Sequence, residues 1–386
     1  MEAGRPAAPG SIISVCYRNS DRSSPAAAPR PATLAVVLFF ALVLSAAGDE
    51  PDTDYPDNGW IALPSIGYSP ENGFILGAAA QYYSVPAPAA PTDSVGLNAI
   101  YGTEGIFSAG AVTNYRFAGN GLLLEAGLGV SRSSDEFAGI GRRPRLEDDP
   151  EEYEVLEVNV VTSLLFPLTS AVSVGPVAGV TVIDIRETEQ DGLLETGDIA
   201  GSDGAVLTPL GVRARYDARD SNVYTTRGFY ADVLARGFMP EWGSSSRFGS
   251  AKLDLRGFYT PVDNFTFGAQ VTSESVVGEA PFQGLATFGG ANIVRGVRSG
   301  RYRDNHAVAG QLELRSPMLW RFRGVLFAGA ATVGDTPATL IDEPPVAAGG
   351  AGIRFAVASE QNQNLRLDIA WDGESISPYI NFGEAF

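Results

Sequence analysis

The residues best suited to chemistry in this 386-residue chain lie in one segment, 289–304. It holds four arginines and four glycines, namely Arg295, Arg298, Arg301, Arg303, Gly289, Gly290, Gly296 and Gly300. An arginine keeps its charge, and its planar fork of donors suits carboxylates. Glycine lets the backbone fold tightly in a confined space. A solvated surface loop needs neither property, so the segment predicts a functional loop.

Catalytic and metal-binding residue types are scarce. His306 is the one histidine, and no obvious nucleophile lies near it in sequence, which gives no support for a Ser-His or Cys-His relay. The one cysteine, Cys16, lies in the N-terminal leader, so the mature chain is expected to lack disulfides and zinc-thiolate sites. A net charge of −18 offers no attraction for nucleic acid. We predict no enzyme activity, no catalytic residue, no metal and no cofactor.

The N-terminus has the layout of a secretory signal. An apolar run of eleven residues, 34–44, follows Arg30 and precedes the small residues of 45–47. The run is shorter than the roughly 20 apolar residues that a membrane-spanning helix needs. A buried core helix is the alternative interpretation. We predict a leader and signal peptide over 1–47, a periplasmic spacer over 48–59 and a single further domain over 60–386.

Beyond the spacer, apolar and polar residues alternate with the period of a β-strand. In 365–372, Leu, Leu, Ile and Trp fall on one face, and Arg, Asp, Ala and Asp fall on the other. Sixteen such segments are expected: 60–68, 74–84, 94–103, 106–117, 121–133, 153–166, 171–186, 204–217, 227–239, 246–260, 264–277, 306–316, 322–334, 347–358, 364–373 and 377–386. The pattern predicts an all-β fold.

Two further features distinguish a membrane barrel from a soluble sandwich. Aromatic residues cap the apolar face near segment ends, at Tyr82, Tyr83, Tyr101, Tyr115, Phe258, Tyr259 and Trp371. The long connections, 134–152, 187–203, 278–305 and 335–346, all fall at one end, and several connections at the other end are tight. Both features, with an even strand number, are typical of outer-membrane barrels. We predict a transmembrane antiparallel β-barrel of 16 strands with the long loops outside.

Four motifs, in order along the chain, resemble those of one family. The first motif, 68–73 (YSPENG), is similar to its first hairpin, and the second, 216–220 (YDARD) with 226–228 (TRG), is similar to its Asp-x-Arg-Asp turn. The third, 288–304, is similar to its sixth external loop and is followed by 311–317 (QLELRSP). The fourth, 378–386 (PYINFGEAF), is similar to its last strand. Over 60–386 the chain thus resembles the barrel domain of the bacterial surface antigen superfamily. That superfamily includes the BamA- and TamA-like assembly factors and the two-partner secretion transporters.

The resemblance implies that external loop 6 folds back into the lumen, with Val294-Arg295-Gly296-Val297 as its signature. In the family, the Asp of a Phe-x-Asp-x-Gly pattern helps to hold the loop arginine. Here the pattern reads Phe327-Ala328-Gly329-Ala330-Ala331, so the Asp is missing. A buried, unpaired cation loses several kcal/mol of solvation, so Arg295 needs another carboxylate. Glu313 is the first choice and Asp368 the second; an Arg295 solvated on an external loop is the alternative.

Two smaller sets of residues concern the ends of the barrel. The resemblance implies that Tyr379, Phe382 and Phe386 form the C-terminal signal by which assembly machinery recognises a barrel, and a place in an aromatic girdle is compatible with that role. Pro64 in the first strand and Pro378 in the last each lack a backbone donor. These prolines predict a weak seam between the first and last strands.

The resemblance implies a protein of the outer membrane of a Gram-negative bacterium that inserts or translocates protein or lipid. Its surroundings would be outer-membrane lipid and lipopolysaccharide, and barrel-assembly machinery would insert it. Assembly and secretion members of the family carry periplasmic modules before the barrel, and 48–59 is too short for one, so the resemblance to the barrel does not by itself carry over the assembly function. A separate periplasmic partner that supplies such modules is one of the partners considered. The alternative function is a passive, porin-like solute channel with a lumen of Arg213, Arg215, Arg256, Asp254 and Asp368.

Overall fold

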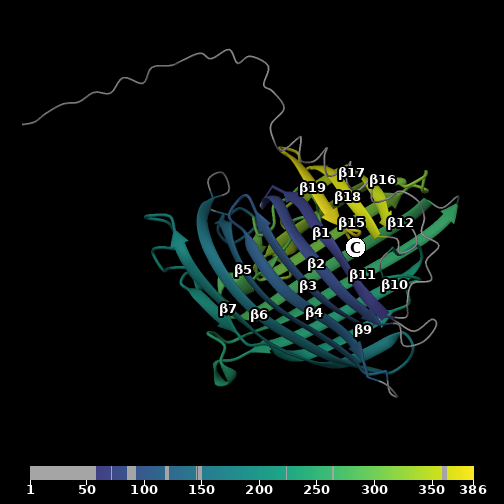
Figure 1. Ribbon diagram of the computed structural model, residues 1–386. Coiled ribbons are helices and arrows are strands. Elements are labelled where there is room, and N and C mark those ends of the chain that lie inside the picture. Colours follow the sequence, from purple (N-terminus) through teal and green to yellow (C-terminus); the bar gives the residue numbers. More distant parts are fainter. Residues whose placement is uncertain are drawn as a thin grey trace, which may run out of the picture. The chain divides into compact units, whose positions relative to one another are not determined.

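The barrel wall begins at Asn58 in the computed structural model (Figure 1). The structure describes residues 58–386 except 71, 85–92, 118–120, 145, 147–149, 223, 263–264 and 359–362. The predicted leader, 1–47, and all but the last two residues of the predicted spacer, 48–59, lie outside the described residues. Among the described residues, no helix is long and apolar enough to cross a membrane.

Sixteen antiparallel strand positions close into one barrel, which confirms the predicted fold class. The strands are β1 (Asn58–Ser69), β2 (Gly73–Ser84), β3 (Asp93–Gly102), β4 (Phe107–Arg116), β5 (Leu123–Phe137), β6 (Glu151–Pro167), β7 (Val172–Thr188), β8 (Gly204–Leu207), β9 (Leu210–Asp217), β10 (Gly228–Phe238), β11 (Phe248–Val262), β12 (Phe265–Gly278), β15 (His306–Arg315), β16 (Phe322–Gly334), β17 (Val346–Ala358), β18 (Gln363–Trp371) and β19 (Ile376–Phe382). The sheet has 17 strands, of which β8 and β9 both pair with β7 and share one position, leaving 16.

The external connections contain short elements of their own. They are β13 (Ala286–Thr287), β14 (Arg303–Asp304) and three short 3-10 helices: η1 (Pro240–Trp242), η2 (Phe282–Gly284) and η3 (Thr339–Ile341). β13 and β14 pair with each other and not with the wall. Loop 6, defined here as residues 279–305 between β12 and β15, is therefore a folded segment with a hairpin of its own.

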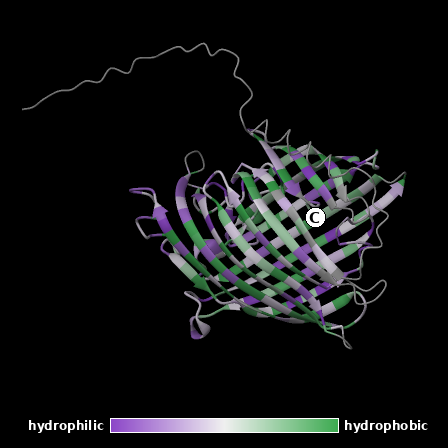
Figure 2. Ribbon diagram, in the orientation of Figure 1, coloured by the Kyte–Doolittle hydropathy of each residue, from purple (hydrophilic) through white to green (hydrophobic). Residues whose placement is uncertain are grey.

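Side-chain alternation builds the two faces of the wall, and Figure 2 shows hydrophobic and hydrophilic residues alternating along the strands. On β18, Ile369 and Trp371 are 60% and 58% exposed, whereas Asp368 is 1% exposed on the inner face. Exposed apolar side chains are favourable there because the outer face of such a barrel meets lipid. The same alternation corrects one expectation: Phe258 points inward and is buried, and its neighbour Tyr259 takes the outer position.

Two segments depart from the predicted strands. Segment 204–217 is interrupted at Thr208 and Pro209, because proline has no N–H for the ladder. The last strand ends at Phe382 and does not reach residue 386. Gly383 adopts a left-handed φ of 80°. The Glu384 carboxylate then accepts hydrogen bonds from Arg354 and Asn364, which hold 383–386 on the inner side of the wall.

The barrel closes where β1 meets β19. Among the described residues, one registered pair, Tyr68↔Ile380, joins these strands, whereas β1 pairs with β2 from Asn58↔Ser84 to Ser69↔Gly73. Gly67 permits this close approach, since a Cβ there would lie 3.0 Å from the Ile380 carbonyl oxygen. The junction is the shortest pairing between neighbouring strands in the described part of the wall.

Apolar packing fills the end of the barrel that carries the long loops. Loop 6 contributes five buried side chains to a cluster with inward residues of the wall: Ala286, Phe288, Val294, Val297 and Tyr302. A second cluster joins Phe137, Tyr153 and Leu194 to Phe282 in η2. The Phe282 ring meets the rings of Phe137 and Tyr153 edge-on, with centroids 5.1 and 5.8 Å away. These contacts attach loop 6 to the wall independently of any charge.

Candidate functional site

The tip of loop 6 depends on backbone that few residues adopt easily. Gly289, Gly290 and Gly296 have positive φ angles, and a Cβ on Gly289 would lie 2.7 Å from the Arg298 carbonyl oxygen. Val294 has a φ of 49°, which costs a β-branched residue about 1–3 kcal/mol. Its side chain is 1% exposed within the larger apolar cluster, and this packing offsets the strain. The result is a tight turn that presents Arg295.

The Arg295 side chain is fully buried between two carboxylates on the inner wall. Its Nη2 atom lies 2.5 Å from Glu313 Oε2 on β15, and its Nη1 atom lies 2.7 Å from Asp368 Oδ2 on β18. The guanidinium carbon also lies 3.6 Å from the centroid of the Phe327 ring, close enough for a cation–π contact. The structure therefore brings Arg295 together with both carboxylates that were considered as its partner.

The missing Asp of the family pattern corresponds to Gly329 on β16. A Cβ at Gly329 would lie 3.4 Å from the Val294 Cα atom and 3.2 Å from the Gln311 side chain. Glycine thus leaves room for loop 6 to pack directly against the wall, where a carboxylate would have to displace it. Glu313 and Asp368 supply the acidic groups from neighbouring strands instead.

Glu313 and Asp368 each serve a second arginine. Arg315 Nε lies 2.7 Å from Glu313 Oε1, and Arg354 Nη1 lies 2.6 Å from Asp368 Oδ1. Arg354 Nε also lies 2.8 Å from Glu384 Oε2, in the segment that follows β19. All of these side chains are at most 4% exposed. Each of these buried charges therefore has at least one neighbour of opposite charge.

We name this set the lumen charge cluster: Arg295, Arg315, Arg354, Arg366, Glu313, Asp368 and Glu384. Sequence reasoning missed four of its members. Arg315 and Arg366 stand two residues from Glu313 and Asp368 on the same strands, so alternation could have found them. Arg354 opposes Arg366 in the β17–β18 register. Glu384 lies past the last strand, where no periodic signal points to it.

The rest of the loop-6 signature contacts the last strand. Gly296 N donates to the Tyr379 hydroxyl at 3.1 Å, and the Ser377 hydroxyl donates to the Gly296 carbonyl at 3.4 Å. A Cβ on Gly296 would lie 3.3 Å from the Cβ atoms of Ala348 and Ala370, so glycine is required for this approach. Loop 6 thus holds β19 from inside the barrel.

Two of the three C-terminal aromatic residues, Tyr379 and Phe386, do not belong to an outer girdle. Tyr379 is 1% exposed and faces loop 6, as its bond to Gly296 requires. Phe386 is buried with its ring centroid 5.7 Å from that of Phe258, and its carbonyl oxygen accepts a hydrogen bond from Arg315. The side chain of Phe382 lies outside the described residues. The inward turn at Gly383 is the reason that Phe386 leaves the lipid-facing surface.

Both seam prolines lie on the outer face. Pro64 opposes Ala78 on β2, and Pro378 opposes Ile369 on β18. Extending the Tyr68↔Ile380 register by four residues would set Pro64 opposite Glu384, which has already turned inward. Neither proline can donate a ladder hydrogen bond at the junction.

Across the lumen, the proposed channel lining forms paired charges. Arg213 and Arg215 on β9 both contact Glu125 on β5, at 3.0 and 2.6 Å, and both contact Asp232 on β10. Arg256 pairs with Asp254 on β11. Asp368, which was expected in the same lining, belongs to the lumen charge cluster. The remaining side chains are partly exposed and line a polar inner surface.

His306 acquires a partner that sequence alone did not indicate. Its Nδ1 atom lies 3.0 Å from Ser275 Oγ on the neighbouring strand β12, in the Ser275↔His306 register pair. Within the described residues, no group of three or more His, Cys, Asp or Glu side chains is placed to hold a metal ion.

Comparisons with known proteins give the same fold. The profile of the Omp85 superfamily domain matches residues 93–384. No curated protein matches the chain. A BamA chain from Haemophilus ducreyi that lacks POTRA domains 1–3 superposes with a TM-score of 0.58 at 15% identity, over 85% of this chain and 70% of that one.

CdiB from Acinetobacter baumannii and CdiB from Escherichia coli superpose with TM-scores of 0.52 and 0.51, each at 11% identity. The matches cover 85% and 86% of this chain but only 59% and 63% of the CdiB chains. Likeness at these identities establishes the barrel architecture.

Proposed function

The chain belongs to the Omp85 superfamily, and from this premise we propose that it inserts or translocates protein or lipid at the outer membrane. It is a transmembrane barrel of the Gram-negative outer membrane. Its barrel superposes on those of BamA and CdiB. The observation that carries the proposal is the junction of β1 and β19, where one registered pair among the described residues closes the wall.

The physical support is the small number of interactions that hold this junction. A backbone hydrogen bond contributes about 0.5–1.5 kcal/mol net in water and more where lipid excludes water, so a ladder of many pairs resists opening strongly. A junction with one registered pair among the described residues does not resist opening strongly. Pro64 and Pro378 lower the number of donors further. The junction is thus the place where this wall opens at the least cost.

Loop 6 supports the proposal by stabilising one side of the junction. Arg295 bridges β15 and β18, and Gly296 holds β19 through Tyr379 and Ser377. These contacts keep the C-terminal strands in register while the junction separates. The residues to which we assign this role are Val294 to Val297, with Glu313 and Asp368 as the partners of Arg295.

The proposed partners follow from the location. Outer-membrane lipid and lipopolysaccharide surround the wall, barrel-assembly machinery inserts it, and a separate periplasmic chain delivers substrate. The alternative, a passive solute channel, has one observation in its favour: the partly exposed ion pairs of Arg213, Arg215 and Arg256 on the inner wall.

A disulfide across the junction tests the proposal. Tyr68→Cys and Ile380→Cys are directly opposite, at a Cα separation of about 4.5–5.5 Å that a disulfide can span. The matched control, Ile66→Cys with Leu76→Cys, bridges β1 and β2, which are already continuously paired. The chain after the expected leader has no native cysteine to interfere.

Proteoliposomes carrying each variant, oxidised or reduced, would be given an urea-unfolded outer-membrane barrel protein or a labelled lipid. We expect the oxidised junction variant to lose insertion or translocation and to regain it on reduction, while the control is active in both states. Planar-bilayer conductance is measured in parallel. Activity in the oxidised junction variant equal to that after reduction contradicts the proposal, and a steady conductance unchanged by the bridge favours the channel.

A further inference from the structure

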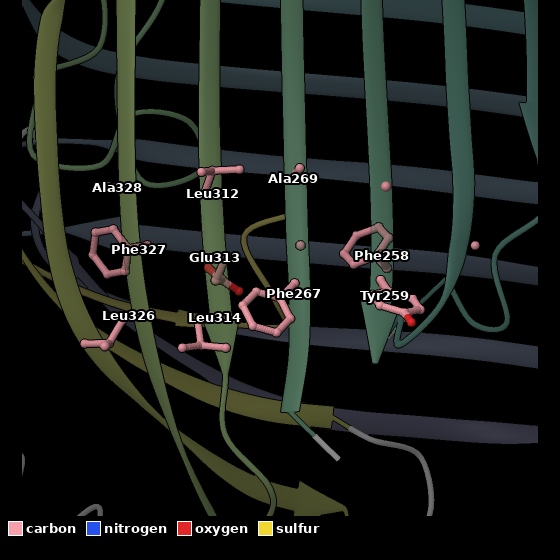
Figure 3. Close-up of a pocket in the computed structure, with 13 residues that line it drawn as sticks. Phe258, Tyr259, Phe267, Ala269, Leu312, Glu313, Leu314, Leu326, Phe327 and Ala328 are labelled. Atoms are coloured by element: carbon pink, nitrogen blue, oxygen red, sulfur yellow. The ribbon is translucent and has the colours of Figure 1, made fainter. Parts of the chain in front are cut away.

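The outer wall carries an apolar groove of about 700 Å³ near the ends of β11 and β12 (Figure 3). Its lining comes from β10, β11, β12, β15 and β16: Gly228, Gly257, Phe258, Tyr259, Phe267, Gly268, Ala269, Leu312, Glu313, Leu314, Leu326, Phe327 and Ala328. The groove lies on a different part of the wall from the β1–β19 junction.

Strand register explains the shape of the groove. One row across four strands is bulky, and Figure 3 shows it as Tyr259, Phe267, Leu314 and Leu326. The next row consists of Gly257, Ala269, Leu312 and Ala328. Three small residues in this second row leave the hollow, and the first row with Leu312 forms its raised sides.

The floor of the groove is supported from inside the barrel. A Cβ on Gly268 would lie 3.1 Å from the Phe386 ring and 3.3 Å from the Phe258 ring. Both rings are buried behind the sheet. Glu313 contributes no charge to the groove, because its side chain is fully buried in the lumen charge cluster. The groove is therefore preformed and presents an apolar surface.

The surroundings of the groove indicate the chemistry of its occupant. Tyr259, Leu312 and Leu326 are 66%, 66% and 58% exposed, and they continue the apolar outer face that meets lipid in such a barrel. Of the two polar side chains in the lining, Glu313 is buried in the lumen charge cluster, so the Tyr259 hydroxyl is the one polar side-chain group of the lining residues that is open to the groove. A long, unbranched hydrocarbon chain fits a surface of this kind.

The position along the strands indicates the leaflet. Tyr259 lies three residues before the end of β11 at Val262, and Phe267 lies two residues after the start of β12 at Phe265. At about 3.4 Å per residue, the bulky row is within roughly 10 Å of the short-turn end of the wall. Short turns of outer-membrane barrels face the periplasm. The periplasmic leaflet of that membrane consists of phospholipid.

We propose that this groove binds one acyl chain of a phospholipid from the periplasmic leaflet. The inference depends on the membrane location of the barrel and not on the proposed insertion or translocation function. Bound lipid would remain at this site during purification, whereas lipid at other lipid-facing positions exchanges freely.

Photo-crosslinking tests the assignment directly. The protein would be reconstituted in nanodiscs of phosphatidylethanolamine that carries a diazirine on one acyl chain, and labelled residues would be mapped by mass spectrometry. We expect label concentrated on Tyr259, Leu312 and Leu326, in excess over Leu97, which is exposed on the outer face of β3. A second preparation with diazirine-labelled lipopolysaccharide should not label the groove above Leu97.

Filling the groove provides the matched variants. Gly257→Leu and Ala328→Leu each place a side chain in the hollow, and Ala99→Leu adds the same volume on an exposed outer position of β3. Each acyl methylene that loses its apolar contact weakens binding by about fourfold, so displacing two or three should lower groove labelling by more than about tenfold. Ala99→Leu should leave it unchanged. Heat-modified electrophoretic mobility checks that each variant is folded.

Three results would overturn the proposal. The first is label spread evenly over the outer wall, and the second is labelling in both filled variants equal to that of the unsubstituted protein. The third is a second copy of the chain, detected by native mass spectrometry and crosslinked at Leu312, which would make the groove a protein interface.

Discussion

Replacement of Arg295 by Ala should destabilise the barrel far more than loss of an exposed ion pair. Removing one partner of a buried pair typically costs about 3–5 kcal/mol, because the remaining charge is left without compensation. In the Arg295→Ala variant, Glu313 still contacts Arg315 and Asp368 still contacts Arg354. The expected loss of stability is therefore near the lower limit, about 3 kcal/mol. Loss of the cation–π contact with Phe327 adds about 1 kcal/mol.

The comparison variants isolate the contribution of the charge pair. Glu313→Gln should destabilise the barrel similarly, since it removes the charge that faces both Arg295 and Arg315. The double variant should cost less than the sum of the two, with a coupling energy of about 0.5–3 kcal/mol. Arg186→Ala, which breaks a pair with Asp184 that is about half exposed, should cost about 0–1 kcal/mol.

Urea unfolding in lipid, followed by heat-modified mobility, measures these differences, and protease sensitivity of loop 6 reports whether the loop is released. Additive effects for Arg295 and Glu313, with coupling to Asp368→Asn instead, would assign Asp368 as the dominant partner. Additivity with both carboxylates, together with rapid cleavage of loop 6 in the unsubstituted protein, would refute the argument that Arg295 fixes the loop.

Two further predictions concern orientation and pH. Asp149→Cys, in the long connection between β5 and β6, should react with an impermeant thiol reagent on intact cells, whereas Asn120→Cys should react only after the outer membrane is opened. Both positions lie outside the described residues. Labelling of Asn120→Cys on intact cells would contradict the orientation in which the long loops face outside. Burial alone would raise the pKa of Asp220 in the turn between β9 and β10, but hydrogen bonds from the Thr226 hydroxyl and from the backbone N–H groups of Thr226 and Arg227 hold this pKa below its ordinary value. A carboxyl whose pKa is lowered by folding stabilises the fold above its unfolded pKa of about 3.9, and this contribution is lost as the pH falls from there through the folded pKa. Asp220→Asn should therefore flatten the acid limb of urea-unfolding curves below about pH 4. An unchanged acid limb would contradict this assignment.

Much of the wall could be predicted because alternation is a local property. Each of the sixteen segments carries its own apolar face, and each appears near the expected position, apart from the break at Thr208 and Pro209 and the early end of the last strand at Phe382. The break at Pro209 could not be predicted from the proline alone, since Pro64 and Pro378 lie inside continuous strands. The inward turn at Gly383 could not be predicted either, because it depends on Glu384 reaching Arg354 and Asn364, which lie on other strands.

In the site as well, positions set by the local sequence could be predicted, and contacts between distant strands could not. Glu313 and Asp368 could be selected because they stand on inward positions of strands that follow loop 6. That Arg295 contacts both at once depends on how far apart β15 and β18 lie across the curved wall, which no sequence pattern specifies. The inward positions of Tyr379 and Phe386 likewise depend on what fills the lumen.

The two edges of the junction should differ in local stability. β19 has β18 on one side and, through Tyr379 and Ser377, the tip of loop 6 beneath it. β1 relies on its ladder to β2, with Tyr68 its one registered contact toward β19 among the described residues. Backbone amides exchange with solvent deuterium according to the free energy of local opening. Exchange should therefore be fast along β1 and slow along β19, which makes separation at this junction a one-sided motion of the N-terminal strand.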